Sequence, residues 1–164
     1  MAEERRDLIL KTLPVQRYRR LLEVGCAAGW MTVPLASRTD ELLAVDISSV
    51  ALQHAREVCR PLANVRFLKL DLLTEPIRGT FDGILCAGVL VFLPAESQQE
   101  VRDRLAAALA PGGDLILEHT VDRYPGEVAG GEIHELYRRH PQLIAIKHQE
   151  ACNYAVTLFR KVPS

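Results

Sequence analysis

Residues 20–29, which read RLLEVGCAAG, carry the strongest structural signal in this chain of 164 residues. The first half of the segment is an apolar run of the kind found in a buried strand. The second half is rich in small residues, and Gly25 and Gly29 frame a tight turn from a strand into a helix. Small residues at such a turn let a ligand approach the backbone closely, so the segment predicts a strand–turn–helix unit beside a ligand.

Apolar runs and helix-like stretches alternate along the rest of the chain. We expect strands over residues 20–24, 42–45, 65–70, 81–86, around 115–117, 143–148 and 154–160, and helices over 3–13, 30–38, 49–59, 97–110 and 131–139. Strands that alternate with helices form a parallel sheet covered on both faces. The last two strands are joined by only a few residues, so they must be antiparallel to each other. We therefore predict an α/β fold, a three-layer sandwich around a seven-stranded, mostly parallel sheet with an antiparallel last strand.

The composition excludes several classes of function. Hydrophobic residues make up 48% of the chain and charged residues 25%, as in a folded globular domain, and the length predicts a single domain. The net charge of -1 and the aromatic content of 5% do not support a nucleic-acid surface. No apolar run approaches the roughly 20 residues of a membrane helix, and the charged start does not resemble a signal peptide. We expect a cytoplasmic protein that contacts neither nucleic acid nor membrane.

The four cysteines indicate neither a metal site nor a disulfide framework, the latter because a chain this long can build a sufficient core without one. They are Cys26, Cys59, Cys86 and Cys152, and no two of them form a Cys-x-x-Cys pair. A zinc site of the usual spacing is therefore not expected, and neither is any other metal site. We expect all four thiols to be reduced.

Candidate ligand contacts follow the strands, because ligands of such sheets bind outside the carboxyl ends of the strands. Asp46 follows the second strand, Asp71 the third, Cys86 the fourth and His119 the fifth. Asp46 stands 21 residues beyond Gly25. An acidic residue about 20 residues after the glycine turn accepts hydrogen bonds from ribose hydroxyls in nucleotide-binding folds. The spacing indicates a cofactor that contains a nucleoside.

The turn does not match the common nucleotide fingerprints. The Gly-x-Gly-x-x-Gly pattern of dinucleotide sites would require glycine where Ala27 and Trp30 stand. A bulky tryptophan at the last position obstructs the close packing of helix on strand, so a nicotinamide dinucleotide is disfavoured. The P-loop pattern is absent as well, which argues against a nucleotide triphosphatase.

Four motifs in order resemble the class I S-adenosylmethionine-dependent methyltransferases. They are EVGCAAG at residues 23–29, VDIS at 45–48, LDL at 70–72 and LAPGGDL at 109–115. The resemblance implies a Rossmann-like domain over residues 1–164 with little or no N-terminal cap over the substrate. It also implies S-adenosyl-L-methionine as cofactor and S-adenosyl-L-homocysteine as product. Residues 4–6, 17–29 and 81–85 look, more narrowly, like the nodulation protein S type of N-methyltransferase, although Ala87 and Gly88 replace the Ser-Glu common in that group.

The resemblance assigns a set of residues to the cofactor. Asp46 would bind the ribose, Ile47 would pack on the adenine, and Asp71 would accept a hydrogen bond from the adenine amino group. Glu23 would lie near the amino group of the methionine part. The full predicted set is Glu23, Gly25, Cys26, Ala27, Gly29, Asp46, Ile47, Asp71, Leu72 and Cys86.

His119 is the candidate catalytic residue, as a general base at the end of the fifth strand. An unperturbed imidazole has a pKa of about 6.5, which suits proton removal near neutrality. A structural or substrate-positioning histidine is the alternative.

The narrower resemblance implies methyl transfer to a small molecule, an amine nitrogen of a sugar or of a natural-product intermediate. The alternatives are an O-methyltransferase that acts on a natural-product hydroxyl, and a cofactor-binding partner subunit without activity of its own. A homodimer or a partner chain would complete an open site.

Overall fold

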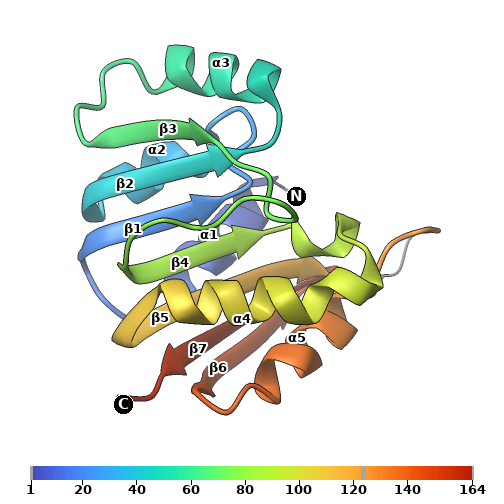
Figure 1. Cartoon of the computed structure of the whole chain (residues 1–164). Coiled ribbons are helices and arrows are strands. Elements are labelled where there is room, and N and C mark those ends of the chain that lie inside the picture. Colours follow the sequence, from blue (N-terminus) through green and yellow to red (C-terminus); the bar gives the residue numbers. More distant parts are fainter. Residues whose placement is uncertain (1, 123–124, 164) are drawn as a thin grey trace.

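The computed structural model describes residues 2–122 and 125–163. Its centre is a seven-stranded sheet in the order β3-β2-β1-β4-β5-β7-β6 (Figure 1). The strands are β1 (Tyr18–Val24), β2 (Thr39–Asp46), β3 (Val65–Lys69), β4 (Phe81–Ala87), β5 (Leu109–Thr120), β6 (Leu143–Ala151) and β7 (Tyr154–Lys161). β7 runs in the opposite direction to the other six strands and is therefore antiparallel to both of its neighbours, β5 and β6. The predicted fold class is confirmed, including the antiparallel last strand.

Helices cover both faces of the sheet (Figure 1). One face carries α1 (Ala2–Thr12), α2 (Thr32–Ala36) and α3 (Ser49–Val58), and the other carries α4 (Gln98–Ala108) and α5 (Gly130–Arg138). Ile9 and Leu35 pack on Leu21 on the first face. Leu105 and Tyr137 pack with other fully buried side chains on the second face. Side chains alternate between the two faces along each strand, so the continuous apolar strands fill both cores at once.

Two predicted boundaries differ from the structure. The helix expected over 30–38 is shorter, because the backbone of Arg38 already accepts a sheet hydrogen bond from Tyr18 (2.8 Å). The proline and glycines at 111–113, expected to end a helix, lie inside β5. They occupy a register shift between β4 and β5, and Gly112 takes φ +76° there. A bulge in a strand tolerates both proline and glycine, which explains how the segment joins the sheet.

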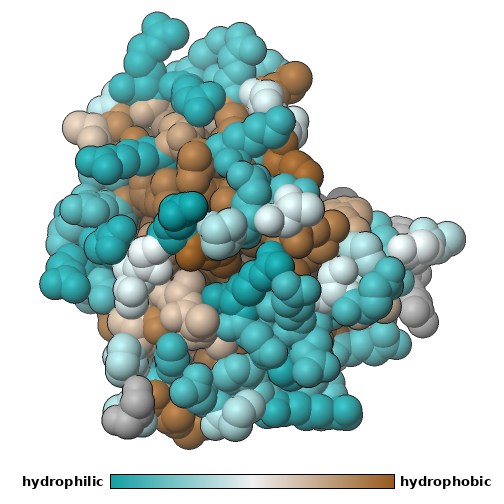
Figure 2. All heavy atoms as spheres, viewed as in Figure 1, coloured by the Kyte–Doolittle hydropathy of each residue, from teal (hydrophilic) through white to brown (hydrophobic). Residues whose placement is uncertain are grey.

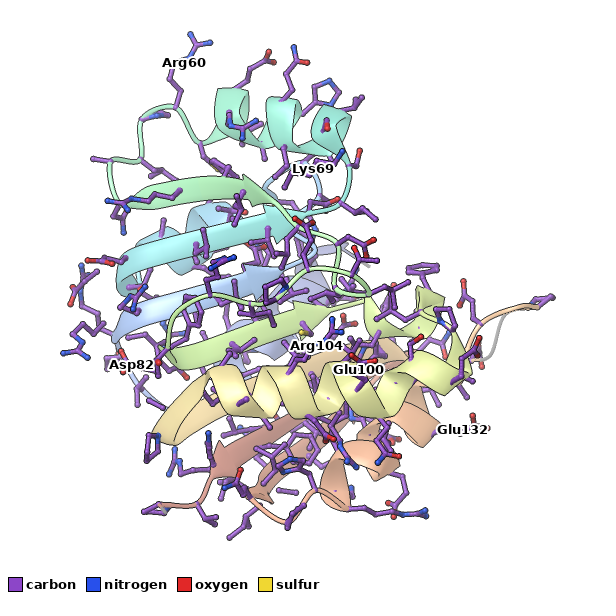
Figure 3. The ribbon with its side chains drawn as sticks, in the orientation of Figure 1. Arg60, Lys69, Asp82, Glu100, Arg104 and Glu132 are labelled. Carbon is purple, nitrogen blue, oxygen red and sulfur yellow. The ribbon has the colours of Figure 1, made fainter. Side chains whose placement is uncertain are left out.

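Residues 70–80, all of them described, connect β3 to β4 without a helix. Arg104 of α4 holds the start of this connection, because its Nη1 donates to the carbonyl of Leu72 (2.8 Å). Glu100, one turn earlier on α4, pairs with the same guanidinium (Figure 3). Since no helix covers the sheet here, hydrophobic residues are exposed between β2, β3 and the connection (Figure 2). Leu68 of β3 is 48% exposed.

Among the described residues, the structure contains no helix that is both long and apolar enough to cross a membrane.

Candidate functional site

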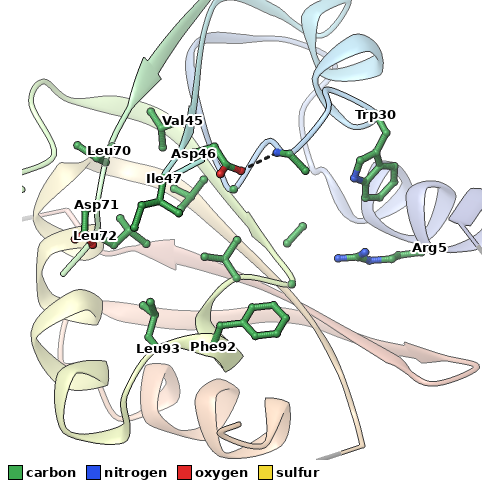
Figure 4. A pocket seen from close by; sticks show the side chains of 16 residues that line it. Arg5, Trp30, Val45, Asp46, Ile47, Leu70, Asp71, Leu72, Phe92 and Leu93 are labelled. Carbon is green, nitrogen blue, oxygen red and sulfur yellow. Dashed lines mark hydrogen bonds between the residues drawn. The ribbon is translucent and has the colours of Figure 1, made fainter. Parts of the chain in front are cut away.

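A cavity of about 380 Å³ opens at the carboxyl ends of β1, β2, β3 and β4 (Figure 4). We call it the main cavity. It brings together six of the residues predicted to bind the cofactor, which are Gly25, Ala27, Asp46, Ile47, Asp71 and Leu72. The other residues that line it include Arg5 of α1, Trp30 just before α2, and Val89 in the segment after β4. Six of the predicted residues thus lie together around one cavity, and their contact with a ligand stays a prediction.

The glycine turn, which contributes Gly25 and Ala27 to the main cavity, has an uncommon backbone conformation. Gly25, Ala27 and Gly29 all lie in the left-handed region, with φ of 75°, 47° and 87°. A Cβ atom on Gly25 would lie 2.0 Å from Cγ2 of Val89, so this position has no room for a side chain. Gly29 instead lies against Ala55 of α3, where a Cβ atom would sit within 3.4 Å of that helix. One glycine therefore opens the cavity, and the other lets α3 pack closely.

The carboxylate of Asp46 is held in place by two backbone donors. Oδ2 accepts from the amide of Ala27 (2.9 Å), as drawn in Figure 4, and Oδ1 accepts from the amide of Ser48 (2.8 Å). Ser48 in turn caps α3 by accepting from Ala51 (3.2 Å). Each carboxylate oxygen keeps a further lone pair, so a pair of adjacent hydroxyls can bind without moving the side chain.

The wall opposite the glycine turn suits a flat aromatic ring. Ile47 is 60% exposed and presents its side chain to the main cavity. Asp71 and Leu72 face it from the start of the connection 70–80. Oδ1 of Asp71 accepts from the amide of Leu73 (2.9 Å), which closes a tight turn. The turn fixes the backbone of Leu72 at the cavity wall, where its peptide groups can bind the edge of a purine.

Four of the predicted cofactor residues do not line the main cavity. They are Glu23, Cys26, Gly29 and Cys86. Glu23 is buried and accepts from the hydroxyl of Thr32 (2.6 Å), which ties the end of β1 to the start of α2. Burial raises the pKa of Glu23 to about 7 and that of Cys26 to about 12, while Cys86 is fully buried in the sheet. These four residues do not line the main cavity, and their contact with the cofactor stays a prediction.

His119 also lies outside the main cavity. Its imidazole is completely buried, and Nδ1 is 3.1 Å from Nε2 of His134 on α5. Burial, with a smaller contribution from His134, lowers the pKa of His119 well below its usual value. The general-base role stays a prediction.

The buried histidines predict a loss of stability in acid. Burial lowers the pKa of His134 to about 4, whereas in the unfolded chain it titrates near 6.5. The unfolded state then binds protons first, so the free energy of unfolding falls as the pH drops from about 6.5 to about 4. For His134 alone the loss is about 2 kcal/mol at pH 5.

Urea unfolding near pH 7 and near pH 5 measures this loss, and His134→Gln should reduce the difference between the two conditions by that amount. His54→Gln on the exposed face of α3 is the matched control and should leave the difference unchanged. An equal acid loss in wild type and His134→Gln would contradict the assignment.

The sequence did not indicate the role of Arg5. This residue of α1 lines the main cavity, and its Nη2 donates to Oε2 of the fully buried Glu118 (2.6 Å). The guanidinium also lies 5.2 Å from the ring of Trp30 and 5.3 Å from that of Tyr154. These partners are distant from Arg5 in sequence, so no local pattern could have found the cluster.

Charges are separated along the main cavity. Arg5 places a cation at one end, while the carboxylates of Asp46 and Asp71 stand toward the other (Figure 4). Between them the lining is largely apolar, with Val24, Val45 and Leu70 among its members. A ligand that fits carries hydroxyls and a flat polar ring at one end. At the other end it carries an acceptor for the guanidinium of Arg5, which already pairs through Nη2 with Glu118.

This fold and this cavity define a class I S-adenosylmethionine-dependent methyltransferase domain. Residues 21–113 match the family model described as "Methyltransferase domain", and the chain belongs to that family. The matched region contains the glycine turn, Asp46, Asp71 and the strand β4. The cofactor of the family is S-adenosylmethionine, and the donor set at the main cavity fits it.

The relatives include both nodulation proteins and O-methyltransferases. Ubiquinone biosynthesis O-methyltransferase of Alkalilimnicola ehrlichii is 30% identical over 125 residues, which are 74% of this chain and 49% of the relative. Nodulation protein S of Sinorhizobium fredii is 32% identical over 117 residues, which are 68% of this chain and 53% of the relative. The chain thus spans about half the length of the nodulation relatives it matches.

Two solved structures show the same likeness. The N-methyltransferase NodS of Bradyrhizobium japonicum superposes with a TM-score of 0.88 at 25% identity, covering 98% of this chain and 96% of that one. Its complex with S-adenosyl-L-homocysteine superposes with a TM-score of 0.87 at 25% identity, covering 97% and 86%.

Proposed function

We propose that this protein transfers the methyl group of S-adenosylmethionine to an amine nitrogen of a small molecule, a sugar or a natural-product intermediate. The observation that carries the proposal is the main cavity, with a fixed carboxylate at Asp46 and a cation at Arg5. The similarity to an N-methyltransferase along nearly the whole chain supports nitrogen as the acceptor atom.

The charges orient the cofactor in one direction. Asp46 binds the two ribose hydroxyls, and Ile47 and Leu72 hold the adenine between them. Arg5 attracts the carboxylate of the methionine part, because a charge-assisted hydrogen bond to a guanidinium is stronger than a neutral one. The guanidinium lies over the rings of Trp30 and Tyr154 and pairs with Glu118, so it is positioned before the cofactor arrives.

The residues of this chain contribute mainly orientation. The cofactor supplies a methyl group that its sulfonium already activates. The glycine turn, Asp46 and Arg5 fix that methyl at the open side of the cavity, beside Ala87 and Gly88. Holding two reactants in a near-attack geometry supplies up to about 7–11 kcal/mol in well-oriented systems. The acceptor approaches past Phe92, which is 68% exposed at the cavity rim.

An acceptor screen with isotopically labelled methyl donor tests the proposal. The panel pairs each amino sugar or amine with the corresponding hydroxyl compound, so that only the acceptor atom differs. We expect label on the amine members and not on their hydroxyl partners. Label on hydroxyl compounds alone would overturn the choice of nitrogen, and absence of transfer to every member, in a protein that binds the cofactor, would favour a partner subunit.

Removing Arg5 tests the orientation of the cofactor. Arg5→Ala should weaken binding of S-adenosylhomocysteine about 10- to 100-fold, because a hydrogen bond to a charged group is worth about 1.5–3 kcal/mol. It should leave binding of methylthioadenosine, which lacks the carboxylate, nearly unchanged. Titration calorimetry with both ligands measures the difference. Arg6→Ala, in the same helix turn but paired with Asp7, is the control. An equal loss of affinity for both ligands would show that Arg5 stabilises the structure and does not bind the carboxylate.

A further inference from the structure

A continuous chain of hydrogen bonds leads from His119 to the protein surface. Nδ1 of His119 is 3.1 Å from Nε2 of His134, and Nδ1 of His134 is 2.5 Å from the hydroxyl of Thr157. The same hydroxyl is 2.7 Å from Nδ1 of His148, whose Nε2 is 3.1 Å from the carboxylate of Glu150. His119, His134 and Thr157 are buried, and His148 and Glu150 are exposed on β6.

If all three imidazoles are neutral, the hydrogen bonds between these residues can be donated in only one direction. A neutral imidazole has one N–H and one acceptor nitrogen, and a hydroxyl has one hydrogen to donate. Glu150 can only accept, so His148 donates from Nε2 and accepts at Nδ1 from the hydroxyl of Thr157. That hydroxyl must then accept from Nδ1–H of His134. Nε2 of His134 therefore accepts from Nδ1–H of His119.

The direction leaves Nε2 of His119 without a proton. This nitrogen is buried, and it has no hydrogen-bond partner among the described residues. Burial lowers the pKa of both His119 and His134, which keeps the two rings neutral. The ring is thus an acceptor whose tautomer is set by four residues on three other elements of the fold.

A backbone hydrogen bond links the strand of His119 to the wall of the main cavity. Gly88, which lines the cavity, donates its amide hydrogen to the carbonyl of Glu118 (2.7 Å), the residue before His119. Glu118 and His119 point to opposite faces of the sheet, as neighbours on a strand do. Glu118 therefore meets Arg5 on the α1 side, while His119 meets α5 behind the segment that follows β4.

We propose that His119, His134, Thr157, His148 and Glu150 form a proton relay that takes up the proton released during methyl transfer and delivers it to solvent at β6. The inference rests on the proposed function, because an amine that is protonated in solution must lose one proton before its nitrogen can attack the methyl group. Nε2 of His119 accepts that proton through the cavity wall, and its Nδ1 proton passes to His134. The Nδ1 proton of His134 passes to Thr157, the hydroxyl proton passes to His148, and the Nε2 proton of His148 leaves to Glu150 or water. One proton enters and one leaves.

The charges around the relay favour outward movement. Arg5 lies across the sheet from His119, Arg138 is on the same helix as His134, and both positive charges disfavour a cation at the inner rings. Glu150 attracts a proton at the outer end. Glu118 lies on the same strand as His119 but is paired with Arg5 on the other face.

Nuclear magnetic resonance of 15N-labelled histidine tests the direction without any acceptor. Long-range nitrogen–proton correlation spectra distinguish a ring that carries its proton on Nδ1 from one that carries it on Nε2. We expect the Nδ1–H form for His119 and for His134 near pH 7. A His119 ring protonated on Nε2 would mean that the hydrogen bonds are donated in the opposite direction, and it would overturn the relay.

Variants at Thr157 test the function of the relay in the active enzyme. Thr157→Val removes the central hydroxyl and should lower kcat at least about tenfold, since general-base catalysis is worth 10²–10⁴-fold. KM for the cofactor should not change. Thr157→Ser keeps the hydroxyl and should restore kcat. Thr39→Val removes another buried hydroxyl, which bonds only within β2, and serves as the control.

The outcomes separate the relay from the proposed function. An unchanged kcat in Thr157→Val, or an equal loss in Thr157→Ser, would overturn the relay while methyl transfer stands. If no acceptor is methylated, the proposed function fails, and the histidine spectra still decide the direction of the chain.

Discussion

Replacing Asp46 with alanine is expected to abolish measurable binding of S-adenosylhomocysteine. The carboxylate is held toward the main cavity by the amides of Ala27 and Ser48, so its remaining lone pairs are fixed for the ribose. Two hydrogen bonds to a charged group are worth about 3–6 kcal/mol, which corresponds to a loss of affinity of at least 100-fold.

Titration calorimetry on wild type, Asp46→Ala and Asp40→Ala measures the effect of Asp46. Asp40 lies on the same strand but is exposed and pairs with Arg17, so its variant should bind normally. A thermal melt must accompany the titration, because Asp46 also holds two backbone amides. Affinity within a few-fold of wild type in a folded Asp46→Ala would remove the ribose contact from the site, and with it the orientation of the cofactor.

Replacing Gly25 with alanine is expected to destroy the site by a different route. The new Cβ atom would lie 2.0 Å from Cγ2 of Val89, and the residue would have to keep φ near 75°. A left-handed backbone costs a non-glycine residue about 1–2 kcal/mol before any clash is counted. Relief requires the turn or the segment after β4 to move, and both line the main cavity. We expect cofactor affinity to fall at least about 100-fold, or by about 3 kcal/mol.

Two further variants separate the clash from the backbone strain. Gly112→Ala has nearly the same φ, +76°, with nothing within 4 Å of the added atom, so it should lower stability by about 1–2 kcal/mol without changing affinity. Adding Val89→Ala to Gly25→Ala removes the clash and should recover part of the affinity. A Gly25→Ala protein that binds the cofactor as well as wild type would show that the turn rearranges freely.

The elements of the fold were predictable because their signals are local. The strands are continuous apolar runs, and Ser48 caps α3 as expected of a serine at that position. The turn at Gly25 and the acid at Asp46 follow one another at a spacing that the strand–helix–strand unit fixes. These features required no knowledge of distant parts of the chain.

The rest of the site depends on contacts between distant segments. Arg5 reaches the main cavity only because α1 packs near β5, and Phe92 only because the segment after β4 crosses the cavity rim. His119 illustrates a second limit. Its place at the end of β5 was predictable, but the face of the sheet to which it points depends on strand register, which the sequence does not state.

The packing of α1 also has a consequence for the order of folding. Besides β1, on which Ile9 packs, α1 contacts β5, β6 and β7. These three strands lie beyond residue 108, so the first helix cannot complete its packing before the last third of the chain has been made. Contacts of such long sequence separation form late, because the entropy of closing the loop must be overcome first. Arg5 and Glu118 are 113 residues apart and join only at that stage. A growing chain on the ribosome can assemble the glycine turn and Asp46, but the end of the cavity that holds Arg5 forms only after β5 has been made. Binding of the cofactor therefore indicates that folding is complete.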